Sequence, residues 1–168
     1  MGEFTATVIT LSDRASKGLY EDISGEEIVK LLNLFFKEHA ASITIIKKLI
    51  PDEAILLQEV LEKEISSKTN FIITTGGTGI GPRDITPDVV IPLLDKQIPG
   101  IMELIRVKYG MQFPSAAISR SVAGVSNQSL IYCLPGSPKA VREYMDEILK
   151  TILHCHKMLK GSDDHLNK

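Results

Sequence analysis

Residues 70–81 read NFIITTGGTGIG, in which a β-branched strand sequence runs directly into a cluster of glycines. Four of the 12 glycines of the chain fall between Gly76 and Gly81. Glycines allow successive backbone N–H groups to turn toward one point, and such a nest binds phosphate. The loop is not a P-loop, because no Lys-Ser or Lys-Thr follows it, and the proline at position 82 excludes the dinucleotide-binding fingerprint. We therefore weigh a phosphate-binding loop against a tight turn that only ends the strand.

Strand and helix patterns alternate along the rest of the chain. Apolar and β-branched runs predict strands over residues 5–11, 42–50, 70–75 and 129–134. Apolar residues at helical spacing predict a short helix from about residue 87 and longer helices over about 24–38, 53–66, 99–109 and 138–159. This alternation predicts an α/β fold, a three-layer sandwich in which a mostly parallel sheet carries helices on both faces.

Capping residues indicate where three of these helices begin. Ser24 with Glu27 three residues later forms a capping-box pattern. Thr86 and Ser137 are natural N-cap residues, and each is followed by a proline, which suits the first position of a helix. Asp88 then complements the dipole of the helix after Thr86. The segment 115–125 fits neither a helix nor a strand period, so no element is predicted there.

The composition is that of one globular domain. A chain of 168 residues and 18.5 kDa suits a single domain, which we place at residues 1–161 with a frayed tail at 162–168. Hydrophobic residues make up 43% of the chain, enough to build a core. The net charge of −2 argues against nucleic acid as a partner, because broad nucleic-acid binding needs a basic surface. Without a signal peptide or an apolar run of about 20 residues, we expect a soluble cytoplasmic protein with no membrane partner.

Four unusual segments follow four of the predicted strands. Ligands bind outside the carboxyl ends of the strands in parallel sheets, so we expect at least some of these segments to share one rim. The segments are residues 12–14, 51–53, 76–84 and 135–138. Their coincidence is the strongest physical indication of a binding site in this sequence.

Asp52 and Asp84 each lie just beyond a predicted strand. Either carboxylate, taken alone, could do no more than cap a helix. Two carboxylates beside a phosphate nest would repel an anionic substrate unless a divalent cation lay between them. Mg²⁺ binds through one or two carboxylates together with substrate phosphates, so this pair predicts a Mg²⁺ site for phosphoryl-type transfer.

Other polar residues near the strand ends have a structural and a functional interpretation. Ser12 and Arg14 either form a strand-ending turn or contact a polar group and a phosphate of the ligand. Ser119 and Arg120 are either a second anion contact or surface residues. The last group is Pro135, Gly136 and Ser137, which precede a predicted helix. They either only begin that helix or also bind an anion at its N-terminus.

Five motifs together resemble those of a known family. They are ITLSDRASKG at 9–18, IPDE at 50–53, TTGGTGIGPRDITPD at 74–88, SRSVAGV at 119–125 and LPGSPKAV at 134–141. In this order the chain resembles the MogA/MoaB family of molybdenum cofactor biosynthesis proteins, and most of all its MogA-type molybdopterin adenylyltransferases. The resemblance extends from about residue 5 to residue 150, and the motif at 74–88 is its most specific part.

The resemblance implies an activity as well as a fold. It implies a single α/β domain that forms homotrimers and a Mg²⁺-dependent nucleotidyltransferase reaction. In that reaction the terminal phosphate of molybdopterin attacks the α-phosphate of ATP, which yields adenylated molybdopterin and pyrophosphate. The adenylated compound is then used for molybdenum insertion, so a molybdenum-insertion protein is a candidate partner.

The resemblance also implies roles for individual residues. Asp52 and Asp84 match the two essential aspartates of the family, which we interpret as catalytic residues that hold Mg²⁺. The other matches are Ser12, Asp13 and Arg14 in the first-strand motif, Thr75, Gly76, Gly77, Thr78 and Gly79 in the phosphate loop, and Pro135, Gly136 and Ser137 in the last motif.

Two alternatives from other classes stay open at this point. The first is a non-catalytic protein of MoaB type that binds or assembles molybdopterin without activating it. The second is a nucleotide-binding regulator that uses the same phosphate nest without a pterin substrate. Residues 83–88 favour the catalytic form.

Overall fold

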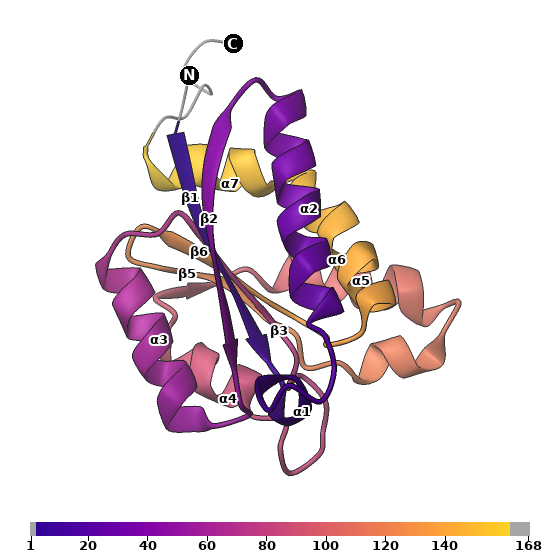
Figure 1. Ribbon diagram of the computed structural model, residues 1–168. Coiled ribbons are helices and arrows are strands. Elements are labelled where there is room, and N and C mark those ends of the chain that lie inside the picture. Colours follow the sequence, from indigo (N-terminus) through magenta and orange to yellow (C-terminus); the bar gives the residue numbers. More distant parts are fainter. Residues whose placement is uncertain (1–2, 162–168) are drawn as a thin grey trace.

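The computed structural model describes residues 3–161, so the predicted tail at 162–168 lies outside it. Six strands make up one sheet (Figure 1), and they are β1 (Glu3–Leu11), β2 (Ser42–Ile50), β3 (Phe71–Thr75), β4 (Lys96–Gln97), β5 (Ala123–Ser126) and β6 (Ser129–Leu134). Their order across the sheet is β2-β1-β3-β6-β5-β4. β1, β2, β3 and β6 are parallel, whereas β4 and β5 run antiparallel to their neighbours. The predicted mostly parallel sheet is therefore confirmed.

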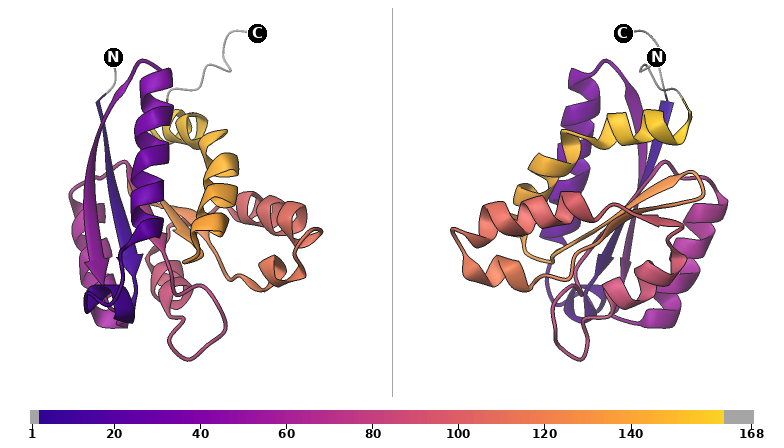
Figure 2. Two further views of the ribbon diagram at one scale, coloured as in Figure 1. Left: turned by 45° about the vertical axis from the view of Figure 1, so that its right-hand side comes forward. Right: turned by 180° about the vertical axis from the view of Figure 1, so that it is seen from behind.

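Helices cover both faces of this sheet, as Figure 2 shows, so the predicted three layers are confirmed. The helices are α1 (Asp13–Ser16), α2 (Ile23–Glu38), α3 (Ala54–Ser66), α4 (Thr86–Val90), α5 (Pro99–Gly110), α6 (Pro138–Leu149) and α7 (Ile152–Leu159). One apolar core lies between the sheet and α2, α5, α6 and α7, and a second lies between the opposite face and α3 and α4. Successive strand residues point to opposite faces, so Ile73 joins the first core and Ile72 the second.

Two of the three predicted caps are wrong, because the serine and threonine hydroxyls bond elsewhere. Asp22, not Ser24, is the N-cap of α2, and its side chain accepts a hydrogen bond from Gly25 N at 2.8 Å. The Ser24 hydroxyl donates instead to the carbonyl of Gly136 at 2.7 Å, which ties α2 to the segment after β6. The cap that forms is local, since Asp22 lies three residues before Gly25, but the distant partner of Ser24 could not be read from the local pattern.

The start of α4 differs from its prediction in the same way. Ile85 is the N-cap and makes no side-chain cap bond, while the Thr86 hydroxyl donates to the carbonyl of Gly76 at 2.8 Å. The N-cap role of Ser137 is confirmed, since its side chain accepts from Ala140 N.

The C-terminal third contains further differences. The single helix predicted over 138–159 is two helices, α6 and α7, which are separated at residues 150–151. The segment 115–125 divides into a 3₁₀ turn, Pro114–Ile118, and strand β5, which is why it showed no single period. Within residues 3–161, no helix is long and apolar enough to cross a membrane.

Glu64 is a buried carboxylate that joins α3 to two strands of the sheet. It accepts hydrogen bonds from Thr7 Oγ1 at 2.6 Å, Thr69 Oγ1 at 2.9 Å and Lys48 Nζ at 2.7 Å. Burial raises the pKa of Glu64, but these three hydrogen bonds together outweigh it, and the pKa lies below its ordinary value of 4.5. A pKa lowered by folding contributes stability above the unfolded-state value and loses it as the pH falls through the folded-state value.

We expect Glu64→Gln to lower the free energy of unfolding at pH 7 by about 1–3 kcal/mol, because Lys48 loses its buried partner. The gap to the wild type should shrink as the pH falls below the ordinary value of 4.5 and through the lower folded-state pKa, where the wild-type carboxylate becomes protonated. Urea unfolding across this pH range measures both effects. Glu59→Gln, an exposed acid on the same helix, is the control and should change little. A gap of equal size at pH 7 and pH 3 would contradict the role given to the charge.

Candidate active site

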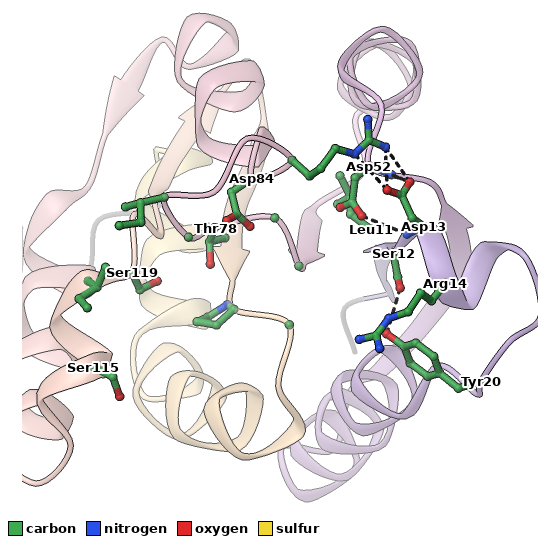
Figure 3. A pocket seen from close by; sticks show the side chains of 18 residues that line it. Leu11, Ser12, Asp13, Arg14, Tyr20, Asp52, Thr78, Asp84, Ser115 and Ser119 are labelled. Carbon is green, nitrogen blue, oxygen red and sulfur yellow. Dashed lines mark hydrogen bonds and ion pairs between the residues drawn. The ribbon is translucent and has the colours of Figure 1, made fainter.

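A cavity of about 750 Å³ opens where β1, β2, β3 and β6 end (Figure 3). It brings together most of the residues that the sequence predicts for a site. The predicted residues that line it are Ser12, Asp13, Arg14, Asp52, Gly76, Gly77, Thr78, Gly79, Asp84, Ser119, Pro135 and Gly136. The rim expected from the topology of a parallel sheet is therefore present.

Three predicted residues lie just outside this cavity. Thr75 lines a neighbouring cavity of about 660 Å³, and its hydroxyl donates to the carbonyl of Pro135 at 2.8 Å. Ser137 lines a smaller one of about 280 Å³ and caps α6. Arg120 lies behind the glycine loop, where it contacts backbone carbonyls. The ligand contacts predicted for these three residues stay predictions.

The cavity also contains residues that were not selected from the sequence. They are Leu11, Tyr20, Ile80, Arg83, Ser115 and Ile118. Arg83 could have been found, because it stands beside Asp84 in the same motif. No pattern in the sequence marks Tyr20, whose hydroxyl lies 2.9 Å from Ser12 Oγ and whose ring lies 5.2 Å from the Arg14 guanidinium.

The glycine loop begins with two residues in the left-handed region. Gly76 has φ +102° and Gly77 has φ +64°, conformations that other residues adopt only with strain. Thr86 holds both of their carbonyls, through its hydroxyl to Gly76 O and its N–H to Gly77 O at 3.0 Å. The N–H of Gly76 continues the sheet and donates to Leu134 O at 3.0 Å. The Gly76 N–H is therefore not available to a phosphate. The candidate donors of the predicted nest are the N–H groups of Gly77, Thr78 and Gly79.

The two predicted aspartates line the same cavity as this loop (Figure 3), and they approach it at different residues. Asp84 accepts a hydrogen bond from Gly81 N at 2.8 Å, and a Cβ atom on Gly79 would stand 2.7 Å from Asp84 Oδ2. A Cβ atom on Gly77 would stand 3.5 Å from Asp52 Oδ1. Glycine at position 79 thus lets the loop backbone approach Asp84 closely, whereas at position 77 the close neighbour is Thr86, whose Oγ1 would stand 2.6 Å from a Cβ atom.

The electrostatic environment of Asp52 fits a cation site. Burial raises the pKa of Asp52 above its ordinary value, and the negative charges of Asp13 and Asp84 add to this shift, while the Asp13 N–H and the positive charge of Arg83 oppose it. The described residues hold no cluster of three or more His, Cys, Asp or Glu side chains arranged for a metal ion. Two carboxylates facing one cavity are nevertheless the protein share of a typical Mg²⁺ site, since substrate phosphates and water supply the other ligands.

Arg120 holds the glycine loop from behind. Its backbone N–H donates to Thr78 O at 2.8 Å and its Nε to Gly79 O at 2.7 Å. Its guanidinium also donates to the carbonyl of Asp84 and to the Asp88 carboxylate, the latter at 2.8 Å. These contacts hold the loop backbone through the carbonyl groups of Thr78, Gly79 and Asp84.

We expect Arg120→Met to lower the free energy of unfolding by about 1–2 kcal/mol, because two loop carbonyls lose charge-assisted donors. Asp88→Asn removes only the exposed ion pair and should cost less than about 1 kcal/mol. Urea unfolding of both variants measures the difference. Equal losses in the two variants would show that the carbonyl contacts of Arg120 add nothing to stability.

Comparison with known proteins agrees with the fold and shows the family. Residues 7–154 match the protein family described as "Probable molybdopterin binding domain". The molybdopterin adenylyltransferase of Helicobacter pylori strain 26695 is 36% identical over 162 residues, which cover 96% of this chain and 90% of that protein.

Two solved structures share the whole architecture. The molybdopterin biosynthesis enzyme MoaB from Thermus thermophilus superimposes with a TM-score of 0.84 at 34% identity, over 94% of this chain and 97% of the other. The molybdopterin biosynthesis Mog protein from Mycobacterium ulcerans superimposes with a TM-score of 0.84 at 33% identity, over 96% of this chain and 99% of the other. Since the family match spans nearly the whole described chain, this protein belongs to the molybdopterin-binding domain family.

Proposed function

We propose that this protein is a molybdopterin adenylyltransferase, which transfers AMP from ATP to the terminal phosphate of molybdopterin and releases pyrophosphate. The observation that carries the proposal is that Asp52, Asp84 and the glycine loop line one cavity. The Helicobacter pylori relative, which bears this activity in its name, supports the choice of substrates.

The residues of the loop would bind and orient the phosphates. The N–H groups of Gly77, Thr78 and Gly79 would donate to phosphate oxygens, and Arg120 and Thr86 keep the loop carbonyls turned away. Asp52 and Asp84 would hold Mg²⁺, which when bound supplies the positive charge that lets two anionic phosphates approach each other.

Neither aspartate needs to act as a strong base. The attacking phosphate of molybdopterin is already anionic, so the task of the site is to align it with the α-phosphate and to stabilise charge. Phosphoryl-type transfer generally depends on positioning and electrostatics in this way. The near-neutral chain meets its anionic substrates with backbone donors and a bound cation instead of a basic surface.

The alternative function is non-catalytic binding of molybdopterin, of MoaB type. The solved MoaB structure shares the fold at 34% identity, so the architecture alone does not distinguish the two. Pyrophosphate release from ATP separates them. The adenylyltransferase requires both molybdopterin and Mg²⁺ for release, whereas the binding protein binds molybdopterin and releases none. A nucleotide-binding regulator would bind ATP with no effect of added pterin.

The proposal includes a homotrimer that passes its product to a molybdenum-insertion protein. Helix α5 supports self-association, because Leu104, Val107 and nearby Met111 expose 56%, 62% and 84% of their surface. Sedimentation equilibrium should give three times the chain mass of 18.5 kDa. A monomer at micromolar concentration would refute the assembly without affecting the assigned reaction.

A further inference from the structure

Three charged residues from separate segments meet at one wall of the cavity. Asp13 begins α1 after strand β1, Asp52 follows strand β2, and Arg83 lies in the loop between β3 and α4. Arg83 donates to both carboxylate oxygens of Asp13, from Nε to Oδ2 at 3.0 Å and from Nη2 to Oδ1 at 2.7 Å. Figure 3 shows Asp13 beside Asp52.

Asp13 and Asp52 are joined by a reciprocal pair of hydrogen bonds. The N–H of Asp13 donates to Asp52 Oδ2 at 3.0 Å, and the N–H of Asp52 donates to Asp13 Oδ1 at 3.1 Å. Both oxygens of Asp13 are therefore occupied within the protein. For Asp52 only Oδ2 is held in this way, and Oδ1 lies toward the glycine loop, 3.5 Å from the position of a Cβ on Gly77.

We propose that Asp13 and Arg83 are positioning residues that set the orientation of Asp52, and that Asp13 is not itself a ligand contact. Arg83 fixes the Asp13 carboxylate, Asp13 in turn fixes Asp52 Oδ2, and Asp52 Oδ1 is left for the ligand side of the cavity. The inference rests on the proposed function, in which Asp52 holds Mg²⁺. It replaces the prediction that Asp13 binds substrate.

The same contacts set the separation of the two metal-binding carboxylates. Arg83 immediately precedes Asp84, so its bond to Asp13 ties the loop that carries Asp84 to the strand ends that carry Asp52. The guanidinium also neutralises Asp13. Without it, three carboxylates instead of two would oppose the anionic phosphates in this cavity.

A purely structural role makes different predictions. The side chains of Arg83 and Asp13 are 59% and 35% exposed, and an ion pair so exposed contributes little to stability. As a structural pair it would leave metal binding unchanged when broken. As a positioning pair it would affect metal affinity. Mutation of a residue that hydrogen-bonds to a metal ligand typically weakens metal binding about 10–100-fold.

The test measures Mn²⁺ binding by electron paramagnetic resonance, with Mn²⁺ standing in for Mg²⁺. The protein is saturated with an ATP analogue that carries a methylene bridge between the α- and β-phosphates, so no turnover occurs. Arg83→Gln and Asp13→Asn should each weaken Mn²⁺ binding about tenfold. The double variant should be no weaker than either single variant, because both break one chain of contacts. Arg83→Lys should not restore binding, since lysine lacks the two-pronged geometry.

The matched control is Arg142→Gln, which removes an exposed arginine that pairs with Glu27 outside the cavity, and it should bind Mn²⁺ as the wild type does. Equal Mn²⁺ affinity in Arg83→Gln and Arg142→Gln would overturn the proposal, and so would additive losses in the double variant. Asp52→Asn separates this failure from that of the proposed function. If Asp52→Asn binds Mn²⁺ normally, the metal role of Asp52 is wrong; if it loses Mn²⁺ while Arg83→Gln does not, only the positioning role is wrong.

Discussion

Asp84→Asn is expected to slow adenylyl transfer by at least about a hundredfold while the fold stays intact, the scale of loss when one electrostatic group is removed from an active site. Asparagine has nearly the same shape and keeps an oxygen that can accept from Gly81 N. It lacks the charge that would hold Mg²⁺ between Asp84 and Asp52. Pyrophosphate release at saturating ATP and molybdopterin measures the rate, and urea unfolding measures the stability.

The control for this variant is Glu53→Gln, which removes an exposed acid beside Asp52 that does not line the cavity. It should retain the wild-type rate. If Asp84→Asn turns over at the wild-type rate, Asp84 is not a catalytic residue. Loss of the fold in Asp84→Asn would instead assign this carboxylate a structural role at the loop.

Gly76→Ala is expected to lower the free energy of unfolding by about 2–4 kcal/mol, which places it among the severe single substitutions. The backbone at Gly76 has φ +102°, and a Cβ atom there would stand 2.3 Å from the carbonyl oxygen of Leu11. That oxygen belongs to β1, which is paired on both sides in the sheet, so it cannot move away without disturbing the sheet. The loop must shift instead, and we expect binding of ATP and Mg²⁺ to be lost with it.

Gly100→Ala tests whether this loss is specific to position 76. Gly100 lies in the first turn of α5, where a Cβ atom would meet no other atom within 4 Å and no positive φ is needed. Alanine there should be neutral or slightly stabilising, since it reduces the entropy of the unfolded chain. Urea unfolding compares the two variants, and similar stabilities for both would contradict the strain assigned to the start of the phosphate loop.

The main strands were predictable because each is a continuous apolar run that ends at a polar or glycine-rich turn. β3 is the clearest case, since all residues of Phe71–Thr75 are buried. β4 could not be predicted in this way, because Lys96–Gln97 is an exposed pair that forms a strand only by pairing with β5. The hydroxyl of Ser24 shows the same limit, since a partner 112 residues away along the chain takes it from its expected capping role.

The site was predictable where position along a strand decides the geometry. Asp52 and Asp84 reach one cavity because both follow parallel strands of one sheet. The sequence was less informative about what each charged side chain does there. Arg120 carries the charge expected of an anion contact, yet its guanidinium bonds to the loop backbone. The pairing of Asp13 with Arg83 spans 70 residues and depends on the folded loop, so no local pattern reveals it.

The fate of the α-phosphate of ATP tests the central claim most directly. ATP labelled at the α-phosphate is incubated with the protein, Mg²⁺ and molybdopterin, and the products are separated. The proposed function predicts that the label moves into adenylated molybdopterin in equal amount to the pyrophosphate released, and that omission of either molybdopterin or Mg²⁺ abolishes the transfer. Label that stays in ATP while molybdopterin binds, or that appears only in free AMP or ADP, would contradict it.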